Sequence, residues 1–130
     1  MAVIKIRIDF DGERYIGHGR IQLLEFIGEH GSIAKAAKAM DMSYKRAWYL
    51  MDEFSALFAD PIIERQHGGR GGGAAKLTPF GADLVRQYRE MEAKALTVFA
   101  KPLASMEKHL VRYAKGDRKP AMKSPQPARE

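Results

Sequence analysis

Hydrophobic and charged residues alternate at the start of the chain. From Ile4 to Phe10 every second residue is isoleucine or phenylalanine, and the residues between them are charged. A period of two is typical of a strand with one buried face. Asp11–Gly12 is a tight-turn signal, and ERYI, residues 13–16, is predicted to return as a short second strand. The pattern therefore predicts an N-terminal β-strand or hairpin.

The apolar spacing changes to a helical period after Gly17 and Gly19, two residues expected to interrupt the chain. The segment RIQLLEFIGEH has apolar residues three apart and is followed by a glycine, which is a helix stop. The alanine-rich SIAKAAKAM and the longer SYKRAWYLMDEFSALF begin with Ser32 and Ser43, and serine is a good N-cap. Three consecutive helices are predicted.

The second half of the chain predicts two short strands and a long helix. IIER and AAKL, residues 62–65 and 74–77, are expected to pair antiparallel across a glycine-rich loop. Thr78 followed by Pro79 is a helix start, and we expect this helix to run to about Lys101. Pro102 interrupts it, and ASMEKHLVRY is predicted to add a short last helix. These elements predict a mainly α fold with a small β-sheet.

The second and third predicted helices suggest a helix-turn-helix, because they are short and joined by about three residues. Ala36 and Ala37 are small enough for two helices to cross closely. Asp41 stands where the turn needs a left-handed backbone, which aspartate tolerates better than most residues. In such motifs the first turn of the second helix reads bases, and its dipole favours phosphate. That turn contains Ser43, Tyr44, Lys45 and Arg46.

The side chains of that turn suit DNA. Its lysine and arginine are long enough to reach guanine edges, and its serine and tyrosine suit phosphate or base contacts. A pair of amphipathic helices with a solvated polar face accounts for the same residues, so this assignment is a hypothesis. Trp48 and Tyr49, further along the helix, are expected in the core and at its flank rather than as stacking platforms.

The glycine-rich loop is predicted to form the tip of a β-hairpin wing beside the third helix. Five glycines fall within residues 68–73 together with one arginine, and glycine lets a backbone lie close to phosphates. In a narrow minor groove that arginine would meet a strongly negative potential. A mobile loop without contacts is the alternative. The candidate DNA contacts of the hairpin are Gln66, His67, Arg70 and Lys76.

A nucleotide-binding enzyme is the other interpretation of these glycines. A P-loop ends in Gly-Lys-Ser/Thr, but the lysine here stands in Ala75-Lys76-Leu77. A dinucleotide fingerprint over residues 69–74 would need a helix to begin at once, where a strand is predicted. The four histidines lack metal-ligand spacing, and no catalytic constellation is found. We therefore expect no enzyme activity, no cofactor and no metal.

Charge and composition narrow the class of partner. The 130 residues carry a formal net charge of +6, which favours polyanions. Residues 115–130 hold five lysines and arginines against two acidic residues, and three of the six prolines. We expect this basic tail to be disordered and residues 1–114 to form one domain. Without an apolar run of membrane length or a secretory signal, a cytoplasmic protein without a membrane partner is predicted.

One long stretch also resembles a known family. GRIQLLEFIGEHGSIAKAAKAMDMSYKRAWYLMDEFSALFADPIIERQHGGRGGGAAKLTPFGADLVRQY closely resembles the DNA-binding N-terminal domain of the molybdate-responsive regulator family, ModE. More distantly it is similar to the winged helix-turn-helix of LysR-type regulators. GSI, SYKRAW and GGRGGGAAKLTPFG are its most specific elements. The resemblance covers about residues 15–100. It implies a winged helix-turn-helix, a homodimer and a palindromic operator in double-stranded DNA.

The resemblance also assigns roles to individual residues. Ser32 and Lys35 would contact phosphate, and Arg70 with wing glycines such as Gly71 would approach the DNA backbone. Full-length members of the family carry C-terminal oxyanion-binding modules. About thirty residues follow Lys101, too few for one module, so direct molybdate binding is not expected. The long helix would supply the dimer interface, through its apolar positions Leu84, Tyr88, Met91, Ala95 and Val98.

The sequence favours a DNA-binding transcriptional regulator that binds a palindromic operator as a homodimer. A low-specificity architectural protein that coats DNA, helped by the basic tail, is one alternative. Another is a DNA-binding subunit whose sensor is a separate partner chain.

Overall fold

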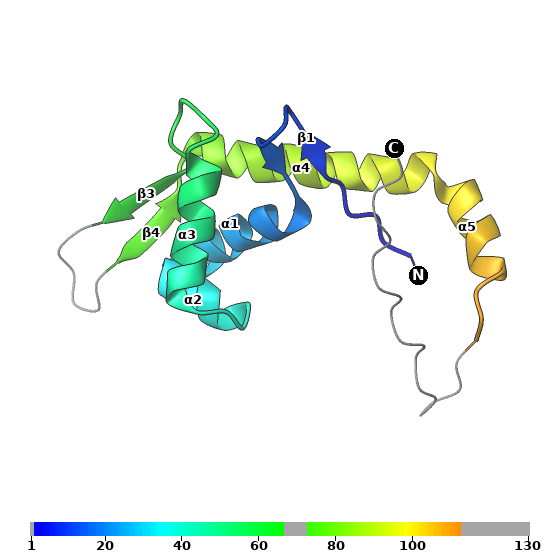
Figure 1. The fold of residues 1–130 in the computed structure, drawn as a ribbon, viewed down its shortest axis with the longest axis horizontal. Helices are drawn as coiled ribbons and strands as arrows, with labels where there is room; N and C mark the ends of the chain where they lie inside the picture. The colour runs from blue at the N-terminus through cyan, green and yellow to red at the C-terminus, as the bar shows by residue number, and fades with distance from the viewer. Residues whose placement is uncertain (1, 67–72, 113–130) are drawn as a thin grey trace.

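The computed structural model describes residues 2–66 and 73–112. This part of the chain is mainly helical, with two small antiparallel sheets of two strands each (Figure 1). The predicted winged helix-turn-helix is confirmed. In chain order the elements are β1 (Ile8–Asp9), β2 (Tyr15–Ile16), α1 (His18–His30), α2 (Ile33–Ala39), α3 (Tyr44–Ser55), β3 (Ile63–Gln66), β4 (Ala74–Leu77), α4 (Pro79–Val98) and α5 (Ala100–Lys108).

The core lies where α1, α2 and α3 meet the start of α4. Ala36 and Ala37 are both buried, as expected for the small side chains that were predicted to let α2 and α3 cross closely. The turn between these helices is a Schellman motif, in which the N–H groups of Asp41 and Met42 donate to Lys38 and Ala37. Asp41 has φ of 56°, the left-handed backbone that the sequence predicted.

Helix α1 begins earlier than expected. Gly19 was predicted to interrupt the chain, but it lies inside the first turn of α1, which starts at His18. Glycine lowers helix stability there by about 0.5–1 kcal/mol relative to alanine, and the packing of the buried residues that follow it outweighs this cost. The predicted stop is confirmed: Gly31 has φ of 79° and donates its N–H to the carbonyl of Ile27.

The N-terminal strand is shorter than its alternating pattern predicted. Ile8 pairs with Ile16 and Asp9 with Tyr15, and residues 2–7 form no strand. The returning segment contributes only two paired residues, so the preceding residues have no ladder partner. Their alternation still has a structural basis, because exposure alternates along residues 2–8 and Ile6 packs against the core.

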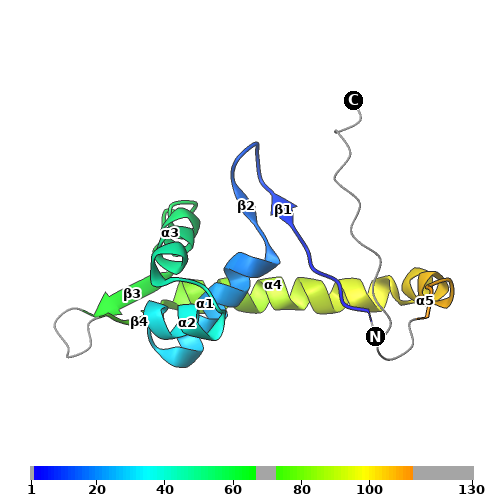
Figure 2. The same cartoon turned by 60° about the horizontal axis from the view of Figure 1, so that its bottom comes forward.

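Helix α4 begins as predicted but ends earlier. Thr78 caps it by accepting the Gly81 N–H at 2.9 Å, and its hydroxyl donates to the Pro61 carbonyl at 2.7 Å. The helix stops at Val98 instead of Lys101, and α5 starts at Ala100. Pro102 therefore lies within α5, in its first turn, where a missing N–H breaks no helical hydrogen bond. Figures 1 and 2 show α4 extending past the other helices, with α5 at its far end.

Candidate DNA-binding surface

The core holds α3 so that its first turn faces solvent. Ala47, Met51 and Phe54 are fully buried on one side of the helix, which fixes its rotation about its axis. Ser43 caps the helix, and its Oγ accepts the Arg46 N–H at 3.1 Å. The cap satisfies one of the N–H groups that begin a helix without a partner, and the rest supply the positive end of the helix dipole.

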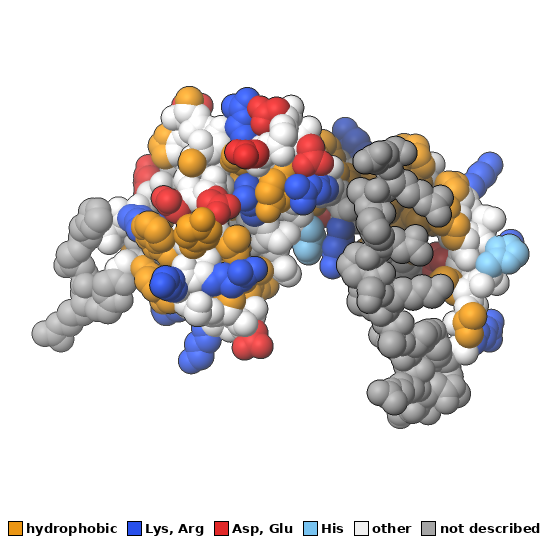
Figure 3. All heavy atoms as spheres, viewed as in Figure 1, with side chains coloured by type: hydrophobic (Ala, Val, Ile, Leu, Met, Phe, Trp, Pro, Cys, Tyr) orange, Lys and Arg blue, Asp and Glu red, His pale blue; other side chains and the backbone are white. Residues whose placement is uncertain are grey.

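The structure brings the predicted recognition residues together on this turn. Tyr44, Lys45 and Arg46 are exposed side by side after the cap. The oxygen of Ser43 is occupied by the helix N–H, so its hydroxyl is free to donate, which suits a phosphate acceptor. In Figure 3 basic side chains lie beside hydrophobic ones over the region of α2 and α3. The first turn of α3 thus presents two exposed cations, Lys45 and Arg46, to solvent.

The start of α2 lies against the wing. Ser32 accepts the Lys35 N–H at 3.0 Å as its N-cap, and it also forms a β-bridge with Ala74. The Ala75 N–H donates to the Gly31 carbonyl at 2.8 Å. These bonds attach β4 to the turn before α2, so Lys35, which is exposed, lies near the base of the wing.

The strands of the wing have two distinct faces. Arg65 pairs with Ala75 and Ile63 with Leu77, and this face packs on the core through the buried Ala75. Glu64 and Lys76 are paired on the other face, where Lys76 Nζ lies 3.5 Å from the Glu64 carboxylate. Lys76 is thus exposed but already held by an acidic neighbour.

Four of the residues predicted to contact DNA belong to the tip of the wing or adjoin it. Gln66 is exposed at the end of β3. His67, Arg70 and Gly71 lie outside the described residues.

Sequence reasoning missed an aromatic and basic pair beside the recognition turn. Trp48 was expected in the core, but 37% of its surface is exposed, and Tyr49 is more exposed still. The guanidinium carbon of Arg65 lies 5.4 Å from the centre of the Trp48 indole. The helical period does give a signal for Trp48, because it lies four residues after the exposed Tyr44 and outside the stripe of buried residues. Nothing in the sequence pairs it with Arg65.

A buried arginine fixes the other side of α3. Arg20, which is buried, donates to the Tyr15 carbonyl and to the Glu53 carboxylate, both at 3.1 Å. Its guanidinium also lies 4.0 Å from the centre of the Tyr15 ring and faces Phe54. Because Glu53 belongs to α3 and Tyr15 to β2, this arginine ties α3 to the N-terminal hairpin.

Residues 19–82 match the bacterial regulatory helix-turn-helix family of lysR type. Residues 19–82 are a LysR-type helix-turn-helix domain. That range contains the capped turn of α3, the Schellman turn before it and both strands of the wing. The family is one of regulatory proteins and not of enzymes, in agreement with the sequence analysis.

The chain as a whole is similar to molybdenum-related proteins. It is 40% identical to the molybdenum transport protein ModE of Azotobacter vinelandii over 68% of this chain and 33% of that protein. The chain is 37% identical to the DNA-binding transcriptional dual regulator ModE of Escherichia coli K12 over 87% of this chain and 46% of that protein. The chain is 39% identical to the molybdenum-pterin-binding protein MopA of Rhodobacter capsulatus over 76% of this chain and 38% of that protein. The chain thus spans between a third and a half of these relatives' lengths.

Part of the dimer interface predicted on α4 is buried within the chain itself. Tyr88 is only 1% exposed, and its hydroxyl donates to the Ile6 carbonyl at 2.6 Å, so it packs within its own chain. Leu84 is half-buried against the same core. Met91 is exposed, Val98 is 70% exposed and Ala95 is half-buried. The assignment of Tyr88 to an interface between chains is therefore wrong, and only the second half of the stripe is available.

An ion-pair network sets the angle of α4 to the LysR-type domain. Arg89 donates from Nε to Glu25 at 3.0 Å and from a terminal nitrogen to Glu92 at 2.6 Å. The same guanidinium lies 3.3 Å from Nδ1 of His18. The hydrogen-bonded Glu25 carboxylate raises the pKa of Arg89 above its usual value. This network joins α1 and α4 by charge-assisted bonds.

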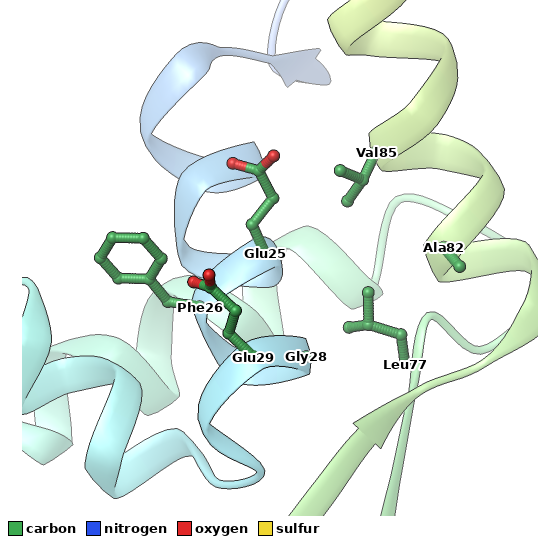
Figure 4. Close-up of a pocket in the computed structure, with 7 residues that line it drawn as sticks. All are labelled: Glu25, Phe26, Gly28, Glu29, Leu77, Ala82 and Val85. Carbon is green, nitrogen blue, oxygen red and sulfur yellow. The ribbon is translucent and has the colours of Figure 1, made fainter.

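A hollow of about 660 Å³ lies between α1, β4 and α4 (Figure 4). Phe26, Leu77 and Val85 supply apolar walls, and the charged groups that line it are the carboxylates of Glu25 and Glu29. Glu25 is paired with Arg89, and none of the residues that line the hollow is a lysine or arginine that could bind a nucleotide phosphate. The hollow therefore gives no support to a nucleotide-binding enzyme.

Two other classes of site receive no support from residues 2–66 and 73–112. Their histidine, aspartate and glutamate side chains form no group of three that could hold a metal ion. None of their helices is both long and apolar enough to cross a membrane.

Proposed function

We propose that this chain is a DNA-binding transcriptional regulator of ModE type, acting in the cytoplasm, in which α3 enters the major groove. The observation that carries the proposal is the first turn of α3. Its cap orients free N–H groups outward, and Lys45 and Arg46 extend from it into solvent. Helices of this motif insert that end into the groove. Arginine and lysine there suit the acceptors of guanine.

The wing would grip the backbone beside the groove. It is attached to α2 through the Ser32–Ala74 bridge and lies beside α3 in both views (Figures 1 and 2). Lys35 and Gln66 are exposed on this side of the LysR-type domain and would contact phosphates, as would Lys76 after releasing Glu64. The residues of the tip, including Arg70, belong to the same proposal.

A homodimer would bind a palindromic operator. The apolar stripe of α4 packs on the core in its first half and continues beyond it, where Met91, Val98 and Phe99 are exposed. Helix α5 has no buried residue, and its Met106 is also exposed. A second copy covering this surface would remove apolar area from water. Two α3 helices would then enter major grooves about 34 Å apart.

Selection of bound sites from a random DNA pool tests this function. The parent protein is expected to enrich a palindromic site with half-sites one helical turn apart. The variants Lys45→Ala and Arg46→Ala should lose discrimination at one base position each, by about 1–3 kcal/mol. Arg86→Ala removes an equal charge from the solvent face of α4 and should select the same site as the parent.

Competition with bulk genomic DNA separates a regulator from an architectural protein. A ratio of specific to non-specific affinity near one would support the low-specificity alternative. Absence of DNA binding at low salt would contradict both interpretations.

The oligomeric state tests the dimer separately. Val98→Glu places a charge on the exposed apolar stripe and is expected to yield monomers in light scattering coupled to gel filtration. Thr97→Glu adds the same charge one position away on a polar face and should leave the dimer intact. A parent protein that is monomeric at high concentration would contradict this part of the proposal.

A further inference from the structure

The guanidinium of Arg65, on β3, is held over an aromatic ring of α3. Its central carbon lies 5.4 Å from the centre of the Trp48 indole, within the range of a cation–π contact. Indole is the strongest partner for such a contact among the aromatic side chains. The pair joins the recognition helix to the wing strands through side chains, at the edge of the candidate DNA-binding surface.

The strand register explains why Arg65, and not Lys76, meets α3. Side chains alternate between the two faces of a strand, so Arg65 shares a face with Ile63, which packs against the core. Its partner across the hairpin is the buried Ala75. This face turns toward the body of the domain. Lys76 lies on the opposite face, paired with Glu64.

The contact with the ring uses the charge of the guanidinium of Arg65 and occupies none of its five N–H donors. Arg65 is exposed, so water or a ligand can reach these donors. A shallow hollow of about 270 Å³, lined by Tyr44, Lys45 and Trp48, lies on the same side of α3. A planar donor group is thus presented beside the recognition turn.

We propose that Arg65 binds a backbone phosphate of DNA between the recognition helix and the wing, and that Trp48 is the residue that positions it. The inference rests on the proposed DNA-binding function and adds two residues to it. Arginine fits phosphate well, because two parallel N–H groups can bind two oxygens. Holding the guanidinium on the indole before DNA arrives reduces the side-chain entropy lost on binding.

The dependence of affinity on salt tests the contact of Arg65 with phosphate. Each neutralised phosphate contributes about 0.9 to the slope of log affinity against log salt concentration. Arg65→Ala is expected to lower that slope by about 0.9 and to weaken binding roughly eightfold at 0.1 M salt, for specific and non-specific duplexes alike. Arg65→Lys should keep the slope and lose part of the affinity. Arg86→Ala, the matched charge control, should change neither. An unchanged slope for Arg65→Ala would overturn the proposal.

A double-mutant cycle tests the positioning role of Trp48. Trp48→Leu removes the ring and should weaken DNA binding, whereas Trp48→Phe keeps a ring and should retain most of the affinity. In the Arg65→Ala background, Trp48→Leu should have no further effect. A full effect of Trp48→Leu in that background would show that the indole acts independently of Arg65, which contradicts the positioning role.

Fluorescence distinguishes failure of this inference from failure of the proposed function. Trp48 is the only tryptophan in the chain, so all tryptophan emission reports on it. Acrylamide quenching of the free protein should change in Arg65→Ala and should fall when a saturating duplex covers the ring. A duplex that binds by anisotropy of its own label but leaves the quenching unchanged would overturn the inference and leave DNA binding intact. No binding at all would overturn the proposed function.

Discussion

Gly81 and Gly19 are both helical glycines, yet alanine at each position is expected to change stability in opposite directions. Glycine in a helix costs about 0.5–1 kcal/mol relative to alanine, so the substitution usually stabilises. A Cβ at Gly19 would have no neighbouring atom within 4 Å. A Cβ at Gly81 would lie 2.1 Å from the carbonyl oxygen of Ile62. Only the first of these positions can accept a methyl group without movement.

The size of the effect at Gly81 follows from what must move. Relieving the clash requires the start of α4 to shift by about 1 Å from the Pro61–Ile62 backbone, and overpacking of this kind typically costs 1–3 kcal/mol. The shift also strains the hydrogen bond from the Thr78 N–H to the Ile62 carbonyl at 3.1 Å. A weakened hydrogen bond adds about 1 kcal/mol. After subtracting the helix-propensity gain, we expect Gly81→Ala to lower the free energy of unfolding by about 1–3.5 kcal/mol.

Urea unfolding followed by circular dichroism measures both substitutions. Gly19→Ala should raise the unfolding midpoint by the equivalent of about 0.5–1 kcal/mol at an unchanged m-value, and Gly81→Ala should lower it. Both variants replace a helical glycine with alanine, so any general effect of that replacement is common to both and cancels when their stabilities are compared. If Gly81→Ala is as stable as the parent, the close approach of α4 to Ile62 is not a constraint and the reasoning is refuted.

Three further predictions concern single side chains. Asp41→Gly should raise the unfolding free energy by about 1 kcal/mol, because glycine adopts the left-handed backbone freely, and lower stability in urea would contradict this. Ser43→Ala should cost about 1 kcal/mol through the lost N-cap, with Ser43→Gly costing less in the same assay. Tyr88→Phe should cost about 1 kcal/mol at neutral pH by leaving the Ile6 carbonyl unpaired. Burial raises the pKa of Tyr88 in the folded protein. Above pH about 10 the unfolded chain therefore loses the phenol proton before the folded chain does, and the free energy of unfolding of the parent falls. A pH series of unfolding curves should show the difference in stability between the parent and Tyr88→Phe shrinking there.

Features set by neighbouring residues could be predicted from the sequence. The caps at Ser32, Ser43 and Thr78 are confirmed, and so are the helix stop at Gly31 and the left-handed backbone of Asp41. Each depends on the side chain or backbone of residues three or four positions away, so a short window contains the whole cause. The first turn of α3 was located in the sequence for the same reason, since its position follows from the cap before it.

Features that depend on distant contacts could not be predicted. Tyr88 follows the helical period of α4 equally well as an interface residue or a core residue, and only the position of Ile6 decides. The pairing of Trp48 with Arg65 needs the hairpin register and the rotation of α3 together. The break before α5 was misplaced because Pro102 fits the first turn of a new helix as well as the end of an old one.

The contacts of Arg20 and Tyr88 bear on how far the protein can be trimmed. The family match spans residues 19–82, but Arg20 needs the carbonyl of Tyr15, which precedes that range. Tyr88, one of the largest fully buried side chains, follows it. In a fragment cut at the limits of the match, the buried Arg20 would lose the Tyr15 carbonyl and keep only Glu53 as an acceptor. The core would also lose the buried ring of Tyr88. A minimal module for structural or binding work must therefore retain the N-terminal hairpin and α4 through Tyr88.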